Sequence, residues 1–150
     1  MIQFVPTGTV PAALGAAAFS RIASACRSVR GVPRGRCVIG VRFVSLAEMQ
    51  RLNRIHRKKD RPTDVLSFAA EEGKPFPHPE RDAERELGDL VVCAPYAVRE
   101  ARRRLIAPRE ELVRLIVHGV MHLAGWDHAT QKEEDRMFAL QERIVERVMS

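Results

Sequence analysis

The chain has 150 residues, of which 45% are hydrophobic and 29% are charged, and these values are typical of one soluble globular domain. No stretch is long and apolar enough to span a bilayer, which excludes a membrane-spanning protein. Lys and Arg outnumber Asp and Glu by 25 to 19, so the formal net charge is +6 and the isoelectric point is near 9.9. Such a basic domain suits a polyanionic partner such as RNA, DNA or an acidic surface, although charge alone fits plain solubility equally well.

The first half of the chain predicts two strands and two helices. A strand is expected at residues 2–5, followed by an alanine-rich helix at residues 11–30, because proline is well placed in a first helical turn. A β-rich run predicts a second strand at residues 37–44. The next helix begins at a capping box formed by Ser45 and Glu48. One face of this helix is predicted to be apolar, through Leu46, Met49, Leu52 and Ile55.

The second half predicts two more strands and three more helices. The strands are expected at residues 65–69 and 90–93, and the charged, proline-rich stretch between them, residues 71–86, is predicted to be an exposed loop. Helices are expected to begin at Pro95, at Pro108 and after a second capping box at Thr130. Three side chains of the last helix are expected to be buried: Phe138, Ile144 and Val148.

These elements predict the fold class. We expect an α+β protein in which a small four-stranded mixed sheet is packed by four to five helices, in a single domain over residues 1–150. The odd number of scattered cysteines predicts small buried hydrophobic residues in a reducing compartment, and no disulfides: Cys26, Cys37 and Cys93. The first 20 residues lack the positive segment of a secretory signal, so we expect a cytoplasmic protein.

The stretch HGVMHLAGWDH at residues 118–128 predicts a metal site. Its histidines have the spacing of the zinc motif H-E-x-x-H-x-x-G-x-x-H. His118 and His122 share one face of the predicted helix, and Gly125 can turn the chain so that His128 returns towards the same ion. Three histidines with one open position are typical of a catalytic zinc site. Imidazoles also suit Ni²⁺, Cu²⁺ or Fe²⁺, so the spacing favours zinc without fixing the metal.

One residue departs from that motif. Zinc peptidases carry a glutamate after the first histidine as their general base, whereas this chain has Gly119 there. Glycine cannot move protons, so peptide hydrolysis is disfavoured. A metal site of this kind still fits hydrolysis in which the leaving group needs less protonation than an amine.

A basic segment at residues 51–61 gives the second functional indication. It holds six cationic side chains, with Asp60 as its one acidic residue: Arg51, Arg54, Arg57, Lys58, Lys59 and Arg61. The positive field of this segment favours a phosphodiester substrate, although a solvated helix end would have the same composition.

Three segments of the chain resemble the motifs of the YbeY endoribonucleases, in the same order. They are residues 52–68, which end in HRKKDRPTDVLSF, residues 86–92 (ELGDLVV) and residues 118–128. Small departures are Met121 and Trp126, where family members more often carry leucine and another aromatic residue or histidine.

The resemblance implies a function and a set of site residues. His118, His122 and His128 would hold one Zn²⁺ ion per chain, and Arg57 aligns with an arginine linked to activity. The implied activity is cleavage of single-stranded RNA, in 3′-end maturation of small-subunit (16S) rRNA and in ribosome quality control. The implied partners are rRNA and the ribosome or its small subunit, with no membrane.

Two other functions remain open at this point. The chain would be a ribosome-assembly factor that binds RNA if its zinc were purely structural. It would be another metallohydrolase, such as a peptidase, if Asp64 or Asp127 replaced the missing base.

Overall fold

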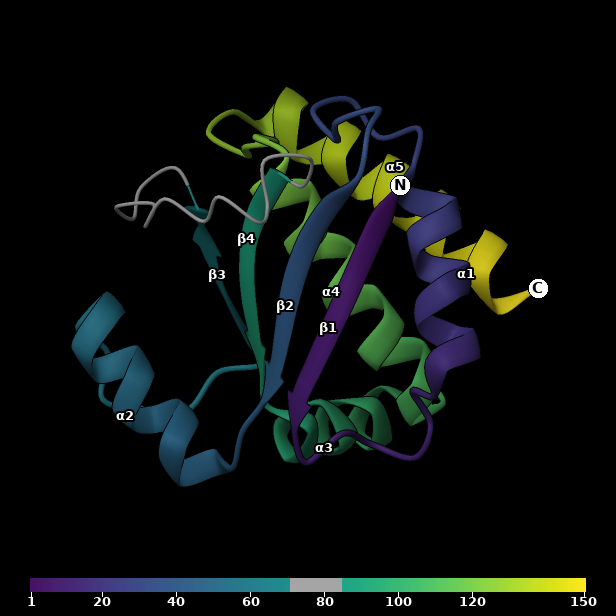
Figure 1. Cartoon of the computed structure of the whole chain (residues 1–150). Helices are drawn as coiled ribbons and strands as arrows, with labels where there is room; N and C mark the ends of the chain where they lie inside the picture. The colour runs from purple at the N-terminus through teal and green to yellow at the C-terminus, as the bar shows by residue number, and fades with distance from the viewer. Residues whose placement is uncertain (71–84) are drawn as a thin grey trace.

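The predicted α+β fold is confirmed by a computed structural model that describes residues 1–70 and 85–150 (Figure 1). The nine elements of the described residues are, in chain order, β1 (Ile2–Gly8), α1 (Ala16–Cys26), β2 (Cys37–Phe43), α2 (Leu46–Arg57), β3 (Val65–Ala69), β4 (Arg85–Val92), α3 (Ala94–Arg104), α4 (Pro108–Leu123) and α5 (Gln131–Met149). Most of the predicted loop at residues 71–86 lies outside the described residues.

The four strands form one mixed sheet in the order β1-β2-β4-β3. β1, β2 and β4 run parallel to one another, and β3 runs antiparallel to β4 at the edge. Parallel strands need crossover connections, and α1 supplies the one between β1 and β2.

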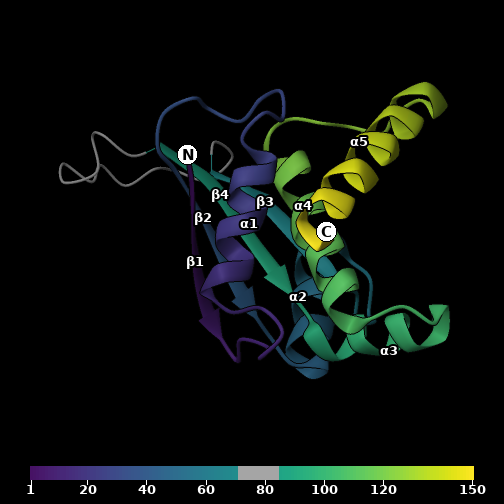
Figure 2. The same cartoon turned by 90° about the vertical axis from the view of Figure 1, so that its right-hand side faces the viewer.

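Helices cover the two faces of this sheet unequally. α1, α4 and α5 pack together on one face (Figure 2), and α4 is the central member of this layer, with Val113, Ile116 and Val120 fully buried. On the other face, α2 packs Met49 and Leu52 against side chains of β3 and β4. Because α4 lies between the sheet and α5, side chains near its C-terminal end meet groups from both.

Both predicted capping boxes begin helices. The Ser45 hydroxyl accepts a hydrogen bond from the Glu48 N–H at 3.1 Å, and the Thr130 hydroxyl accepts one from the Glu133 N–H at 3.1 Å. The three cysteines are buried and unpaired, as predicted. The described residues contain no helix with the length and apolarity needed to cross a membrane.

Several predicted boundaries and burials were wrong. α1 begins at Ala16 rather than at Pro11, because residues 11–14 form a separate turn in which the Leu14 N–H donates to the Pro11 carbonyl. β4 begins at Arg85 rather than at residue 90, since its polar start pairs with β2.

The predicted apolar faces of α2 and α5 also included residues that are exposed. Phe138 is 61% exposed, because the apolar stripe of α5 runs through Met137 and Ile144 and leaves Phe138 to one side. Ile144 and Val148 are buried as predicted, whereas the α2 residues Leu46 and Ile55 are exposed because the apolar contact of α2 with the sheet is made by Met49 and Leu52.

Candidate active site

Two histidines of α4 face each other one helical turn apart. The Nε2 atoms of His118 and His122 are 2.9 Å apart, and the ring centroids are 4.5 Å apart. Both side chains are half-buried. Residues four apart share a helix face, which is why the sequence spacing brings these two nitrogens together.

The third histidine returns to this pair through a glycine turn. Gly125 has a φ of +98°, in the left-handed region that favours glycine. The Trp126 N–H donates to the Met121 carbonyl and the Gly125 N–H donates to the His122 carbonyl, which is the Schellman pattern of a helix end. The ring centroid of His128 then lies 5.3 Å from that of His122.

The structure thus gathers the three predicted ligands without bringing their donor atoms to one point. Within residues 1–70 and 85–150, no three His, Cys, Asp or Glu side chains form a finished metal-binding cluster. His128 is exposed and follows the glycine turn, whereas His118 and His122 lie within one helix. A three-histidine site therefore requires His128 to come closer to the pair formed by His118 and His122.

The hydrogen bonds of the two Nδ1 atoms determine what the two Nε2 atoms can bind. Nδ1 of His118 lies 2.6 Å from Oε1 of Gln141, and Nδ1 of His122 lies 3.1 Å from the Trp126 carbonyl oxygen. Both partners are acceptors, so each Nδ1 carries a proton. If both Nε2 atoms carry lone pairs, they repel at 2.9 Å unless a proton or a metal cation lies between them. Histidines that bind metals show this pattern of outer hydrogen bonds, so the residues fit a metal ion.

The electrostatic surroundings favour the neutral form of His122. Burial lowers the pKa of His122, and the neighbouring His118 and His128 rings lower it further. Metal ions bind the neutral imidazole, so a lowered pKa keeps the lone pair available.

A cavity of about 580 Å³ opens beside the two histidines. Residues from four helices and β3 line it, including Arg57, Arg104, Arg114, His118, His122 and Gln141. The cavity therefore combines two of the three candidate metal ligands with three arginines, and His128 is not among its lining residues.

Arg57 enters this cavity from the end of α2. Its guanidinium donates to the Ser67 carbonyl at 3.2 Å and lies 5.7 Å from the centre of the Phe68 ring. These contacts orient the side chain without neutralising its charge. Among the other cations of the basic segment, Arg51 pairs with Glu48 and Arg54 pairs with Asp60, away from the cavity.

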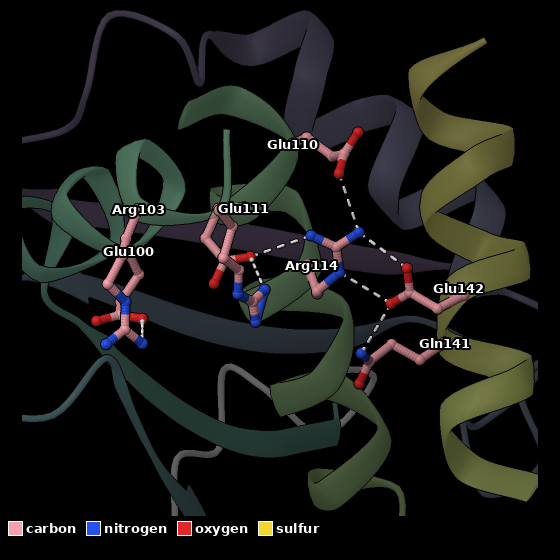
Figure 3. Close-up of polar contacts among 8 residues, drawn as sticks. Glu100, Arg103, Glu110, Glu111, Arg114, Gln141 and Glu142 are labelled. Atoms are coloured by element: carbon pink, nitrogen blue, oxygen red, sulfur yellow. Dashed lines mark hydrogen bonds and ion pairs between the residues drawn. The ribbon is translucent and has the colours of Figure 1, made fainter. Parts of the chain in front are cut away.

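The other two cavity arginines differ in how far nearby carboxylates neutralise their charge. Arg114 contacts three carboxylates, those of Glu110, Glu111 and Glu142, so it is neutralised within the fold (Figure 3). Arg104 is half exposed, and among residues 1–70 and 85–150 its one ion pair is with Glu111, at 3.3 Å, a carboxylate that Arg114 shares. Arg57 and Arg104 are thus the cations that the cavity presents to an anion.

The position of the missing peptidase base is closed by packing. Gly119 is buried against β4, and a Cβ placed there would lie 2.6 Å from a methyl carbon of Leu90. The space beside Gly119 is filled by the sheet, so a longer side chain would disturb that contact.

The two aspartates considered as substitute bases each accept a hydrogen bond from a backbone N–H. Asp64 accepts a hydrogen bond from the Val65 N–H at 2.7 Å, and Asp127 accepts one from the His128 N–H at 2.7 Å. Asp64 lines the cavity and Asp127 does not. Trp126 packs against the core and donates from its indole to the Arg30 carbonyl, so it supports the turn.

Sequence reasoning missed Gln141, Arg104 and Arg114 as cavity residues. Gln141 had a detectable signal, since it is a polar residue in the apolar stripe of α5. Arg104 had none, because its neighbours Arg102 and Arg103 look the same in sequence.

Comparisons with known proteins identify the family. The family model for endoribonuclease YbeY matches residues 12–149. The chain is 43% identical over 131 residues to an endoribonuclease YbeY of Alkalilimnicola ehrlichii, with 86% of this chain and 75% of the relative covered. It is 40% identical over 113 residues to that of Persephonella marina, with 75% and 71% covered.

A solved structure gives the same result for the fold. A Thermotoga maritima protein with a solution structure matches with a TM-score of 0.65 and 30% identity, over 99% of this chain and 89% of its own. With a family match over nearly the whole chain, the protein belongs to the endoribonuclease YbeY family.

Proposed function

We propose that this endoribonuclease is zinc-dependent and specific for single-stranded RNA. His118, His122 and His128 hold one Zn²⁺ ion, and Arg57 is the catalytic cation. The same proposal places the enzyme in the cytoplasm, acting with the ribosome or its small subunit in 3′-end maturation of 16S rRNA and in ribosome quality control. The resemblance of the three sequence motifs to the family supports this choice of RNA.

One observation carries the proposal for the metal. The Nε2 atoms of His118 and His122 face each other at 2.9 Å while both Nδ1 atoms face oxygen acceptors. This arrangement supports a bound cation at the cavity wall. When bound, zinc would supply a Lewis acid that polarises a phosphate oxygen and activates a water molecule.

The chain's own residues supply the rest of the reaction. Arg57 would donate to the non-bridging oxygens of the scissile phosphate, where charge increases in the transition state. Its contacts with Ser67 and Phe68 hold the guanidinium in place before substrate binds. Arg104 would bind a phosphate of the same strand, and the net positive charge of the chain would attract the backbone in a salt-dependent way.

The attacking oxygen comes from water or from the 2′-hydroxyl of the RNA, and the products separate these routes. Attack by water leaves a linear phosphate end, whereas attack by the 2′-hydroxyl leaves a 2′,3′-cyclic phosphate. End-group analysis of cleaved RNA therefore decides between them.

The direct test uses zinc-loaded protein with matched single-stranded and double-stranded RNA. We expect the single strand to be cleaved, and we expect chelation or His122→Ala to abolish cleavage. Cleavage that survives both treatments at full rate would overturn the proposal. The ribosomal role is tested with small-subunit rRNA that carries a 3′ extension, and removal of the extension is the expected result.

A further inference from the structure

A buried glutamine interrupts the apolar stripe of α5. Gln141 is 6% exposed, and the stripe around it is formed by Met137, Ile144, Val145 and Val148. An amide at such a position is unfavourable unless its polar atoms are paired. Both ends of this amide have partners, and those partners lie on opposite sides of it.

The Glu142 carboxylate fixes which way the amide points. Nε2 of Gln141 donates to Oε2 of Glu142 at 3.1 Å, and a carboxylate can only accept (Figure 3). The amide oxygen must therefore face the other way, where it meets Nδ1 of His118 at 2.6 Å. An amide oxygen also only accepts, so the proton of His118 is held on Nδ1.

Arg114 in turn holds Glu142. Its Nε and Nη2 donate to the two carboxylate oxygens at 2.9 and 2.8 Å, which is a bidentate pair. Arg114 lies on α4 one turn before His118, so the chain of contacts leaves α4, crosses to α5 and returns to the same helix. Glu110 and Glu111 complete the contacts of Arg114 (Figure 3).

We infer that Gln141 is a positioning residue that selects the metal-binding tautomer of His118. The Arg114–Glu142 pair orients the amide, the amide holds the proton on Nδ1, and the Nε2 lone pair is left facing the site. His122 obtains the same tautomer from the Trp126 backbone carbonyl, which no substitution removes. The tautomer of His118 depends on one side chain, and this inference rests on the proposed metal site.

The tautomer is measured on metal-free protein by long-range ¹H–¹⁵N correlation spectra of the imidazoles, at about pH 8, where histidine is ordinarily neutral. We expect His118 to carry its proton on Nδ1 in the wild type and to lose this preference in Gln141→Leu. Gln141→Glu keeps an acceptor for Nδ1 but loses the donor to Glu142, so it should restore the preference only in part. Glu110→Gln changes a contact of Arg114 that is not part of the series from Arg114 through Glu142 and Gln141 to His118. This variant should leave the Nδ1 preference of His118 unchanged. A wild-type His118 protonated on Nε2 would overturn the inference, even if Gln141→Leu did not fold.

Zinc affinity, measured by competition with a chelator, gives the second readout. Outer-sphere partners of this kind change metal affinity by about 10–100-fold, and we expect a loss in that range for Gln141→Leu with partial recovery in Gln141→Glu. Equal affinity in the wild type and Gln141→Leu would refute the role of Gln141 alone. Absence of zinc binding in the wild type would instead refute the proposed function.

Discussion

Gly119 of α4 lies against Leu90 of β4 so closely that a Cβ would come within 2.6 Å of one Leu90 methyl carbon and 2.9 Å of the other. Leu90 is fully buried and has little room to move. Gly119, which stands where zinc peptidases carry their glutamate, therefore has a packing role against the sheet.

Gly119→Ala is expected to lower the free energy of unfolding by about 1 kcal/mol, because overpacking of a filled core outweighs the higher helix propensity of alanine. Gly35→Ala is the matched control, since a Cβ there meets nothing within 4 Å and its φ is not in the left-handed region. Denaturant unfolding of both variants measures the difference. Equal stability of the two would show that the Leu90 side chain or α4 shifts at little cost.

Arg57→Ala is expected to lower kcat by about 10²–10³-fold, the range observed when one donor that stabilises transition-state charge is removed. Zinc content should not change. Arg54→Ala is the control, because Arg54 lies on the same helix, pairs with Asp60 and does not line the cavity. Similar losses in both variants would assign the effect to the general positive field of the segment.

Arg104→Ala is expected to weaken RNA binding and to lower its salt dependence. Loss of one phosphate contact with a single strand reduces the log–log salt slope by about 0.7. The neighbouring Arg103 is more exposed, pairs with Glu100 and does not line the cavity, so Arg103→Ala should leave the slope unchanged. An identical slope change in the two variants would contradict a specific phosphate contact at Arg104.

The ion pair between Arg114 and Glu142 predicts a pH dependence of stability. The hydrogen bond from Arg114 lowers the pKa of Glu142 below the ordinary 4.5. The folded protein thus holds this proton less tightly than the unfolded chain, so the pair stabilises the fold above the ordinary value. The contribution is lost as the pH falls through the lowered pKa.

Glu142→Gln tests this dependence. We expect the variant to be less stable than the wild type at neutral pH and the difference to shrink as the pH falls below about 4, in thermal melts across that range. Lys132→Gln, which changes one charge near the start of the same helix, is the control. A difference between wild type and Glu142→Gln that stayed constant with pH would contradict this role of the pair.

Sequence reasoning succeeded where the determining interactions are local. The capping residues Ser45 and Thr130 place the starts of α2 and α5, and the left-handed Gly125 turns the chain after α4. The i, i+4 spacing of His118 and His122 places both on one helix face. In each case, residues within four positions along the chain decide the result.

Sequence reasoning failed where partners come from distant segments. The start of β4 depends on its pairing with β2, which lies more than 40 residues earlier. Gln141 becomes part of the site only because α5 packs on α4, and Arg104 differs from Arg103 only through the direction in which each leaves α3. Phe138 was predicted to be buried because hydrophobicity does not define where an apolar stripe ends.

The proposed zinc is expected to serve catalysis rather than folding. The buried core is built from apolar side chains of the sheet and helices, and His118 and His122 lie at its margin. Removal of zinc should therefore abolish cleavage while the far-ultraviolet circular dichroism spectrum remains that of a folded protein. Unfolding on chelation would favour the assembly-factor alternative with a structural zinc.

The central claim is that His118, His122 and His128 hold a zinc ion used in RNA cleavage. The most direct measurement is elemental analysis of the purified wild type and His122→Ala, with single-stranded RNA cleavage recorded on the same samples. We expect about one zinc per wild-type chain with cleavage, and neither zinc nor cleavage in the folded variant. An active wild type without metal, or equal zinc content in both proteins, would contradict it.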